Sequence, residues 1–207
     1  ELLPEQIIQK SSNVGITKVT AAMGAETWYG FIRKFGFGQR IGQDFIGEST
    51  GIVRNVSGWR RIDIATSSFG QGISVTPLQL ATAFSALVNG GNLMRPYLVS
   101  QVLDNDGKVV QKANPMILRR VISPASSREI TRMLALVTQP GGTATRAAIP
   151  GYSVAGKTGT AQKPDPEHGR YFPEKKVASF IGAVPAEDPE IVVLVVFDDP
   201  KGSRSEK

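Results

Sequence analysis

The sequence predicts an α+β fold, in which a mainly helical part is followed by an antiparallel sheet. Residues 1–150 contain several segments with helical spacing and one short hairpin pattern near 97–112. Residues 151–207 contain three runs rich in β-branched and aromatic residues. Because one run, 191–197, is apolar without interruption, we expect a central strand that is buried on both sides, with helices on both faces of the sheet.

The first part of the chain is predicted to form helices at 2–10 and 14–23. A third helix is indicated by apolar residues at positions i, i+3, i+4 and i+7, namely Trp28, Phe31, Ile32 and Phe35. Gly36 is a natural end for it. Residues 36–58 contain six glycines in a polar stretch, which predicts an ordered loop.

The strongest helix signal begins at Thr76, which is followed by Pro77 and by Gln79. This order is a capping box with proline at the first helical position, so the sequence predicts a helix up to residue 88. Asp-Gly within 104–107 predicts a hairpin between 97–103 and 108–111.

A further helix that ends at residue 137 has two candidate starts, Ser123 and Ser126. Beyond it we expect strands at 152–162, 177–184 and 190–198. The short turn at 185–189 makes the last two antiparallel neighbours. The simplest organisation is that residues 1–207 are part of a single domain.

Composition excludes several classes of function. The chain of 207 residues has no cysteine and one histidine, so thiolate sites and thiol nucleophiles are absent and a histidine-rich metal site is not expected. The net charge is +6, but the basic residues are dispersed, which argues against nucleic-acid binding. We expect no metal and no cofactor.

Lys157-Thr158-Gly159-Thr160 is the sharpest motif, and it lies on a predicted strand. Two hydroxyl groups at alternate positions can hold a carboxylate, and a lysine beside them supplies positive charge. Gly159 allows an extended substrate to approach the backbone closely. The competing interpretation is an exposed strand with a solvated lysine.

Ser11 and Asn13 lie at the break between two predicted helices, where a hydroxyl and an amide can project into a shared cleft. Alone, this pattern favours a helix cap, because serine and asparagine are the commonest capping residues. Together with Lys157-Thr158-Gly159-Thr160, it favours function.

Residues 47–51 match the G-x-S-x-G nucleophile elbow around Ser49. An elbow needs a strand before the serine, a helix after it and a histidine base. A glycine-rich loop precedes Ser49, no clear helix follows, and His168 lies in a proline- and glycine-rich segment. We interpret this motif as a coincidence.

Taken together, K-T-G-T-A-Q at 157–162, Ser-Ser-Asn at 11–13 and S-F-G-Q-G-I-S-V-T-P-L-Q-L at 68–80 resemble class B penicillin-binding proteins. These are the D,D-transpeptidases that crosslink peptidoglycan stem peptides ending in D-Ala-D-Ala. The resemblance implies a penicillin-binding and serine β-lactamase-like transpeptidase fold, and inhibition by β-lactams.

The resemblance also implies roles for individual residues. Ser11 would carry a proton to the leaving nitrogen, Asn13 would orient the acyl chain, and Lys157 would sustain the electrostatic field around Ser11. Thr158 and Thr160 would hold the substrate carboxylate beside Gly159. The backbone N–H of Thr160 would form half of an oxyanion hole.

One departure from the family pattern is large, because no S-x-x-K occurs in the 207 residues. In the family this motif supplies the nucleophilic serine and the general-base lysine, and it precedes Ser-Ser-Asn. We therefore expect a domain truncated at both ends, which on its own is inactive. The resemblance further implies an extracytoplasmic, periplasmic location, a membrane anchor before residue 1, and membrane partners in division or elongation.

Two alternatives remain at this point. A β-lactam sensor or hydrolase would keep the fold but let water replace the acceptor amine. A non-catalytic division scaffold would keep the fold as a docking surface. Intact Ser11, Asn13 and Lys157 argue against the scaffold, although the missing nucleophile segment leaves it open. The rate of deacylation of the full-length protein would separate a transpeptidase from a sensor or hydrolase.

Overall fold

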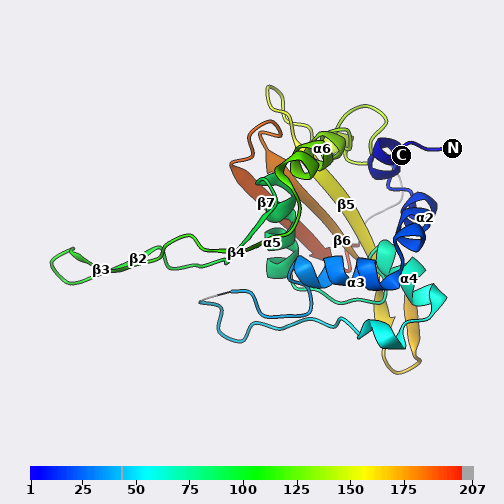
Figure 1. The fold of residues 1–207 in the computed structure, drawn as a ribbon, viewed down its shortest axis with the longest axis horizontal. Coiled ribbons are helices and arrows are strands. Elements are labelled where there is room, and N and C mark those ends of the chain that lie inside the picture. Colours follow the sequence, from blue (N-terminus) through cyan, green and yellow to red (C-terminus); the bar gives the residue numbers. More distant parts are fainter. Residues whose placement is uncertain (43, 202–207) are drawn as a thin grey trace.

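The computed structural model describes residues 1–42 and 44–201 and confirms an α+β fold. Figure 1 shows helices gathered beside a twisted three-stranded sheet, with one long hairpin projecting from the body. The helices are α1 (Pro4–Gln9), α2 (Asn13–Met23), α3 (Ala25–Lys34), α4 (Arg61–Ser68), α5 (Pro77–Val88) and α6 (Pro124–Ala135), with short 3-10 turns η1 (Val56–Gly58) and η2 (Thr145–Ala147). Within the described ranges, no helix is both long and apolar enough to span a bilayer.

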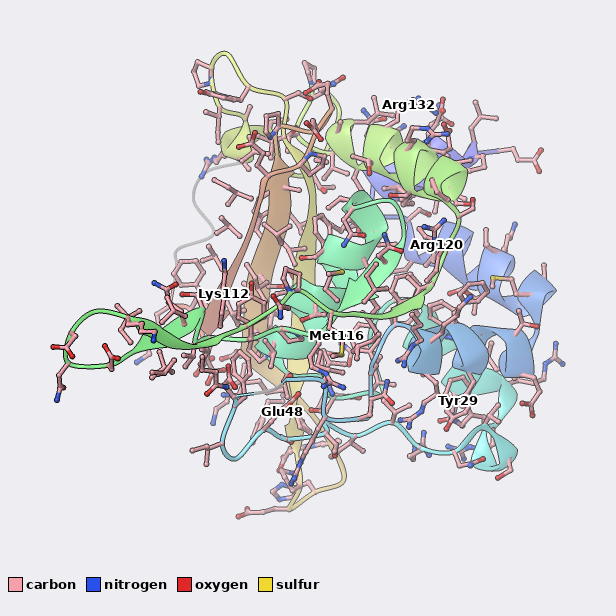
Figure 2. All side chains as sticks on the ribbon, turned by 60° about the vertical axis from the view of Figure 1, so that its left-hand side comes forward. Tyr29, Glu48, Lys112, Met116, Arg120 and Arg132 are labelled. Atoms are coloured by element: carbon pink, nitrogen blue, oxygen red, sulfur yellow. The ribbon has the colours of Figure 1, made fainter. Side chains whose placement is uncertain are left out.

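The strands form three separate antiparallel sheets. The main sheet has the order β5 (Ala155–Asp165), β6 (Arg170–Val184) and β7 (Ile191–Asp198). Two smaller pairs join β1 (Asn92–Met94) to β4 (Ile117–Arg120) and β2 (Gln101–Leu103) to β3 (Val109–Lys112). The β2–β3 pair is the predicted hairpin, and Lys112 marks it in Figure 2.

The helix starts follow the capping signals in the sequence. Thr76 Oγ1 accepts the N–H of Gln79 at 3.1 Å, and Gln79 Oε1 accepts the N–H of Thr76 at 3.0 Å, which is the predicted capping box of α5. Ser123 caps α6 by accepting the N–H of Ser126 at 3.0 Å. Ser123 is therefore the true start of the two candidates.

The prediction that residues 191–197 form a central strand buried on both sides is wrong. Among the described residues β7 pairs only with β6, so it is an edge strand. Val192 and Leu194 pack against the core, whereas Ile191, Val193 and Phe197 are exposed. Packed and exposed side chains alternate along this part of β7, but the sequence does not reveal this, because the inward and the outward positions are both apolar.

The core lies between the main sheet and two helices. Phe84 and Val88 of α5 and Leu134 of α6 pack against Ile181 and Ala183 of β6. Because α5 and α6 also contact each other, they cover the same face of the sheet. The expected second helical layer on the other face is not seen in the described part of the chain, and the apolar side chains of β7 on that face are exposed.

Gln79 connects α5 to the glycine-rich loop and is completely buried. Its Nε2 donates to the carbonyl oxygens of Gln39 and Thr50, each at 2.9 Å, while its Oε1 completes the capping box. Within the same loop, the Glu48 carboxylate accepts the N–H groups of Ile41 and Gly42. The loop is thus ordered by side-chain hydrogen bonds to backbone groups, as predicted.

Replacing Gln79 with alanine should destabilise the fold by about 3 kcal/mol, because buried backbone groups of the loop and of the capping box lose their partners. Urea unfolding of the variant and the wild type would measure the loss. Gln111→Ala on the exposed hairpin is the matched control and should change little. Equal stabilities for the two variants would contradict this role of Gln79.

Candidate active site

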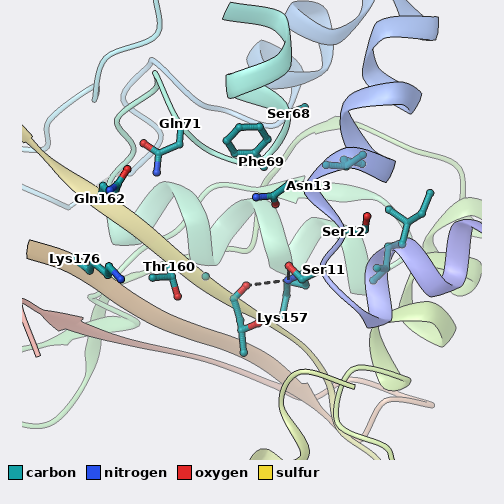
Figure 3. Close-up of a pocket in the computed structure, with 15 residues that line it drawn as sticks. Ser11, Ser12, Asn13, Ser68, Phe69, Gln71, Lys157, Thr160, Gln162 and Lys176 are labelled. Atoms are coloured by element: carbon teal, nitrogen blue, oxygen red, sulfur yellow. Dashed lines mark hydrogen bonds between the residues drawn. The ribbon is translucent and has the colours of Figure 1, made fainter. Parts of the chain in front are cut away.

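A cleft of about 610 Å³ lies between the turn that joins α1 to α2 and the outer edge of β5. It brings together Ser11 and Asn13 from the start of the chain and residues 157–160 from β5. All six residues singled out in the two motifs line this one cleft. Figure 3 labels four of them, Ser11, Asn13, Lys157 and Thr160, together with Phe69 and Gln71 from the segment that follows α4.

The turn between α1 and α2 explains how Ser11 and Asn13 reach the cleft. Ser11 has φ of 52°, a left-handed conformation that few residues other than glycine adopt. Ser12, not Ser11 or Asn13, caps α2, because its Oγ accepts the N–H of Gly15 at 3.1 Å. The helix-cap interpretation therefore belongs to Ser12, which leaves the side chains of the other two residues to face the cleft.

The closest contact across the cleft joins the two motifs. Lys157 Nζ donates to Ser11 Oγ at 2.7 Å and to the carbonyl oxygen of Thr158 at 3.0 Å. Burial lowers the pKa of Lys157 from its usual 10.5, because desolvation penalises the charged amine. An amine with a lowered pKa that touches a hydroxyl oxygen is well placed to support proton transfer through that hydroxyl.

The edge position of β5 allows both of its faces to contribute to the cleft. Lys157 pairs with the core residue Ile181, so its side chain projects from the face of the sheet that the helices cover. The side chains of Thr158 and Thr160 project from the opposite face. Both faces border the cleft because β6 is the only described strand that pairs with β5.

Further contacts hold the carboxylate-binding candidates in place. Thr158 Oγ1 lies 3.1 Å from Thr143 Oγ1, in the loop before η2. Gly159 faces Ser179 across the strand pair, and a Cβ on Gly159 would lie 2.6 Å from Ser179 Oγ. Glycine at this position therefore fits the sheet itself as well as the approach of a substrate.

Helix α4 was not predicted, and it positions one wall of the cleft. Its first turn is stabilised by the Asp63 carboxylate, which accepts the N–H of Arg60 at 2.8 Å and also pairs with Arg54. These contacts, first that with Arg60, lower the pKa of Asp63. Ser68 Oγ lies 3.1 Å from Thr17 Oγ1 and so joins the end of α4 to α2. No side-chain cap precedes α4, which is why the sequence pattern did not indicate it.

The structure gives Ser49 none of the features of a nucleophile elbow. Ser49 is exposed in a loop, its Oγ accepts the N–H of Gly51, and no helix follows it. His168 Nδ1 instead contacts Asp165 at 2.8 Å, near the tip of the β5–β6 hairpin. Across the described ranges, no group of three or more histidine and acidic residues is arranged to hold a metal ion.

The order of the motifs along the chain and their meeting in one cleft agree with the comparison to known families. All of residues 1–207 match the family model "Penicillin binding protein transpeptidase domain". The chain belongs to this family. Its relatives place it with the class B members, as the sequence motifs predicted.

Relatives with curated names agree with this assignment. Stage V sporulation protein D of Bacillus subtilis is 42% identical over 199 residues, which cover 96% of this chain and 30% of that protein. Peptidoglycan D,D-transpeptidase FtsI of Escherichia coli is 35% identical over 99% of this chain and 32% of its own length. The chain thus spans about a third of the curated relatives that it matches.

Solved structures show the same fold. The transpeptidase domain of Burkholderia pseudomallei penicillin-binding protein 3 is 40% identical with a TM-score of 0.82, covering 94% of this chain and 55% of that one. Penicillin-binding protein 3 of Mycobacterium tuberculosis, complexed with ampicillin, is 34% identical with a TM-score of 0.88, covering 95% and 45%. The roles assigned to single residues stay predictions, since these comparisons concern whole domains.

The lowered pKa of Lys157 predicts a pH-dependent stability. Between its folded-state pKa and 10.5, the unfolded chain binds more protons, so the free energy of unfolding should rise with pH in this window. Lys157→Met removes this contribution. The free energy of unfolding of the wild type, relative to that of the variant, should therefore increase as the pH approaches 10.5. Urea unfolding at several pH values would test this. A difference that is independent of pH would contradict the burial of a charged amine.

Proposed function

We propose that this chain forms part of a peptidoglycan D,D-transpeptidase that acts through a serine acyl-enzyme. The observation that supports this most strongly is the contact between Lys157 Nζ and Ser11 Oγ at 2.7 Å, beside two threonines on an open strand edge. The nucleophilic serine and its general-base lysine belong to an S-x-x-K segment outside these 207 residues, and the open cleft is where that serine would enter.

The reaction has two acyl-transfer steps. The serine oxygen forms an ester bond with the penultimate D-Ala carbonyl of a donor stem peptide, and the amide bond to the terminal D-Ala breaks. The serine proton passes through the Ser11 hydroxyl to the leaving nitrogen, so that D-Ala departs as a neutral amine. The amine of a second stem peptide then attacks the ester, forms the crosslink and returns a proton to the serine.

The remaining residues bind and orient the donor. Thr158 and Thr160 donate hydrogen bonds to its terminal carboxylate, and Lys157 adds positive charge. The N–H of Thr160 stabilises the oxyanion of the tetrahedral intermediate. Asn13, whose side chain faces the cleft, binds the amide of the acyl chain. No step needs a metal or a cofactor.

We expect β-lactams to inhibit this activity, because they present a strained amide beside a carboxylate to the same groups of the cleft. We also propose that the whole protein acts outside the cytoplasm, in the periplasm where such an envelope exists. A membrane anchor ahead of residue 1 would hold it there, and membrane proteins of division or elongation would be its partners. These proposals depend on the activity assigned to the cleft.

Residues 1–207 alone should not be labelled covalently by a fluorescent penicillin, whereas the chain joined to its S-x-x-K segment should be labelled with one probe per molecule. Gel fluorescence and intact mass would measure this, with heat-denatured protein as the control. A transpeptidase should then hold the acyl group for a long time, while a hydrolase would release it quickly. Labelling of residues 1–207 alone would place the nucleophile within them and contradict the proposal that it lies in a separate S-x-x-K segment.

Thr143→Val should slow acylation by penicillin about threefold in the protein joined to its S-x-x-K segment, because the Thr158 hydroxyl loses the partner that orients it. The acylation rate constant is the measurement. Thr145→Val, at an exposed position two residues further on, is the matched control and should leave the rate unchanged. Equal effects of the two variants would show that the contact between Thr143 and Thr158 does not orient the carboxylate site.

A further inference from the structure

The charges that line the cleft are all of one sign. Among the residues that the structure describes, fifteen form its walls, and Lys157 and Lys176 are the charged ones of this set. Figure 3 shows the two lysines at different ends, with Lys157 beside Ser11 and Lys176 beside Gln162. The mechanism above uses the first lysine and leaves the second without a role.

The register of the sheet brings Lys176 to the same side as the carboxylate-binding threonines. Lys176 on β6 lies directly opposite Gln162 on β5, so both side chains project from the same face of the sheet. Thr160 precedes Gln162 by two residues and shares that face. Along this face the cleft therefore presents, in order, Thr158, Thr160, Gln162 and, beside the last, the amine of Lys176.

Nearby acidic groups do not neutralise Lys176. Asp198 pairs with Lys163, at 2.8 and 3.0 Å from its Nζ. Asp199 contacts Lys176 only through a backbone hydrogen bond, in which its N–H donates to the Lys176 carbonyl oxygen. Across residues 1–42 and 44–201, no salt bridge involves Lys176. The residue is half-buried and lines the cleft, so its amine is available to a ligand there.

The direction of the bound donor follows from the proposed function, on which this inference rests. The terminal carboxylate lies at Thr158, and the reacting carbonyl lies at the N–H of Thr160. The rest of the acyl chain then continues along β5 toward Gln162. It reaches Lys176 after about two further residues of strand, or about 7 Å.

We propose that Lys176 is a specificity-determining residue that binds a second carboxylate, carried by the acyl part of the donor. The preferred donor is then a peptide with an acidic group a short distance before its D-Ala-D-Ala end. A donor that is neutral in this region would still react, because Lys176 does not touch the reacting atoms, but more slowly.

Two penicillins test this, because they differ by one carboxylate in the acyl side chain. Benzylpenicillin has none there, and carbenicillin has one. The acylation rate constants of both would be measured with the chain joined to its S-x-x-K segment, as wild type and as Lys176→Gln. The variant should lower the ratio of the carbenicillin rate to the benzylpenicillin rate about threefold, which is the range of a partly exposed ion pair.

Two further variants provide controls. Lys175→Gln removes the same charge from the next residue, whose amine lies 4.3 Å from the Phe172 ring centroid and which does not line the cleft, so the ratio should not change. Lys176→Arg keeps the charge and should keep the ratio. In the wild type alone, high salt should reduce the ratio, because salt screens a partly exposed pair. This measurement does not depend on the folding of any variant.

The outcomes separate the two levels of the proposal. One outcome is that benzylpenicillin acylates the wild type while neither Lys176→Gln nor high salt changes the ratio of the two rates. In that case Lys176 does not bind a second carboxylate, and the inference fails while the proposed function stands. An equal fall in Lys175→Gln would show an effect of net charge and would also overturn it. If neither penicillin acylates the wild type, the proposed function fails and this inference fails with it.

Discussion

The hydrogen bond between Lys157 and Ser11 is the interaction on which the cleft depends. It joins residues that lie 146 positions apart in the sequence. On one side it needs β5 to be held in register by β6, so that the Lys157 side chain projects from the helix-covered face. On the other side it needs the left-handed turn at Ser11, between α1 and α2, which places that hydroxyl within hydrogen-bond distance of Lys157. A change in either element would separate the two motifs.

The second constraint is that β5 is paired on one side only within the described part of the chain. An open strand edge exposes backbone donors and acceptors along its length, which suits an extended peptide. The same opening allows side chains from both faces to border one cleft, which a strand in the middle of a sheet would not permit. The half-buried Lys157 and Thr158 and the exposed Thr160 thus border one cleft because of a single structural feature.

Local sequence signals predicted the elements that have local causes. The capping box at Thr76 and the Asp-Gly hairpin appear where the residues indicated them, because hydrogen bonds between near neighbours determine both. Helix α4 escaped prediction because its first turn depends on Arg54 and Asp63, a pairing that sequence periodicity does not reveal. The strand β7 was placed wrongly, because uniform apolarity conceals which face is buried.

The sequence by itself determined the fold class, the family and the six motif residues of the cleft, because motif order and residue chemistry are written along one chain. Only the tertiary structure decided which side chains share a space. It assigned the helix cap to Ser12 rather than to its neighbours, placed Thr143 against Thr158, and brought Lys176 beside Gln162. These contacts depend on strand register and on the direction of side chains at an open edge, and no pattern of near neighbours encodes either of them.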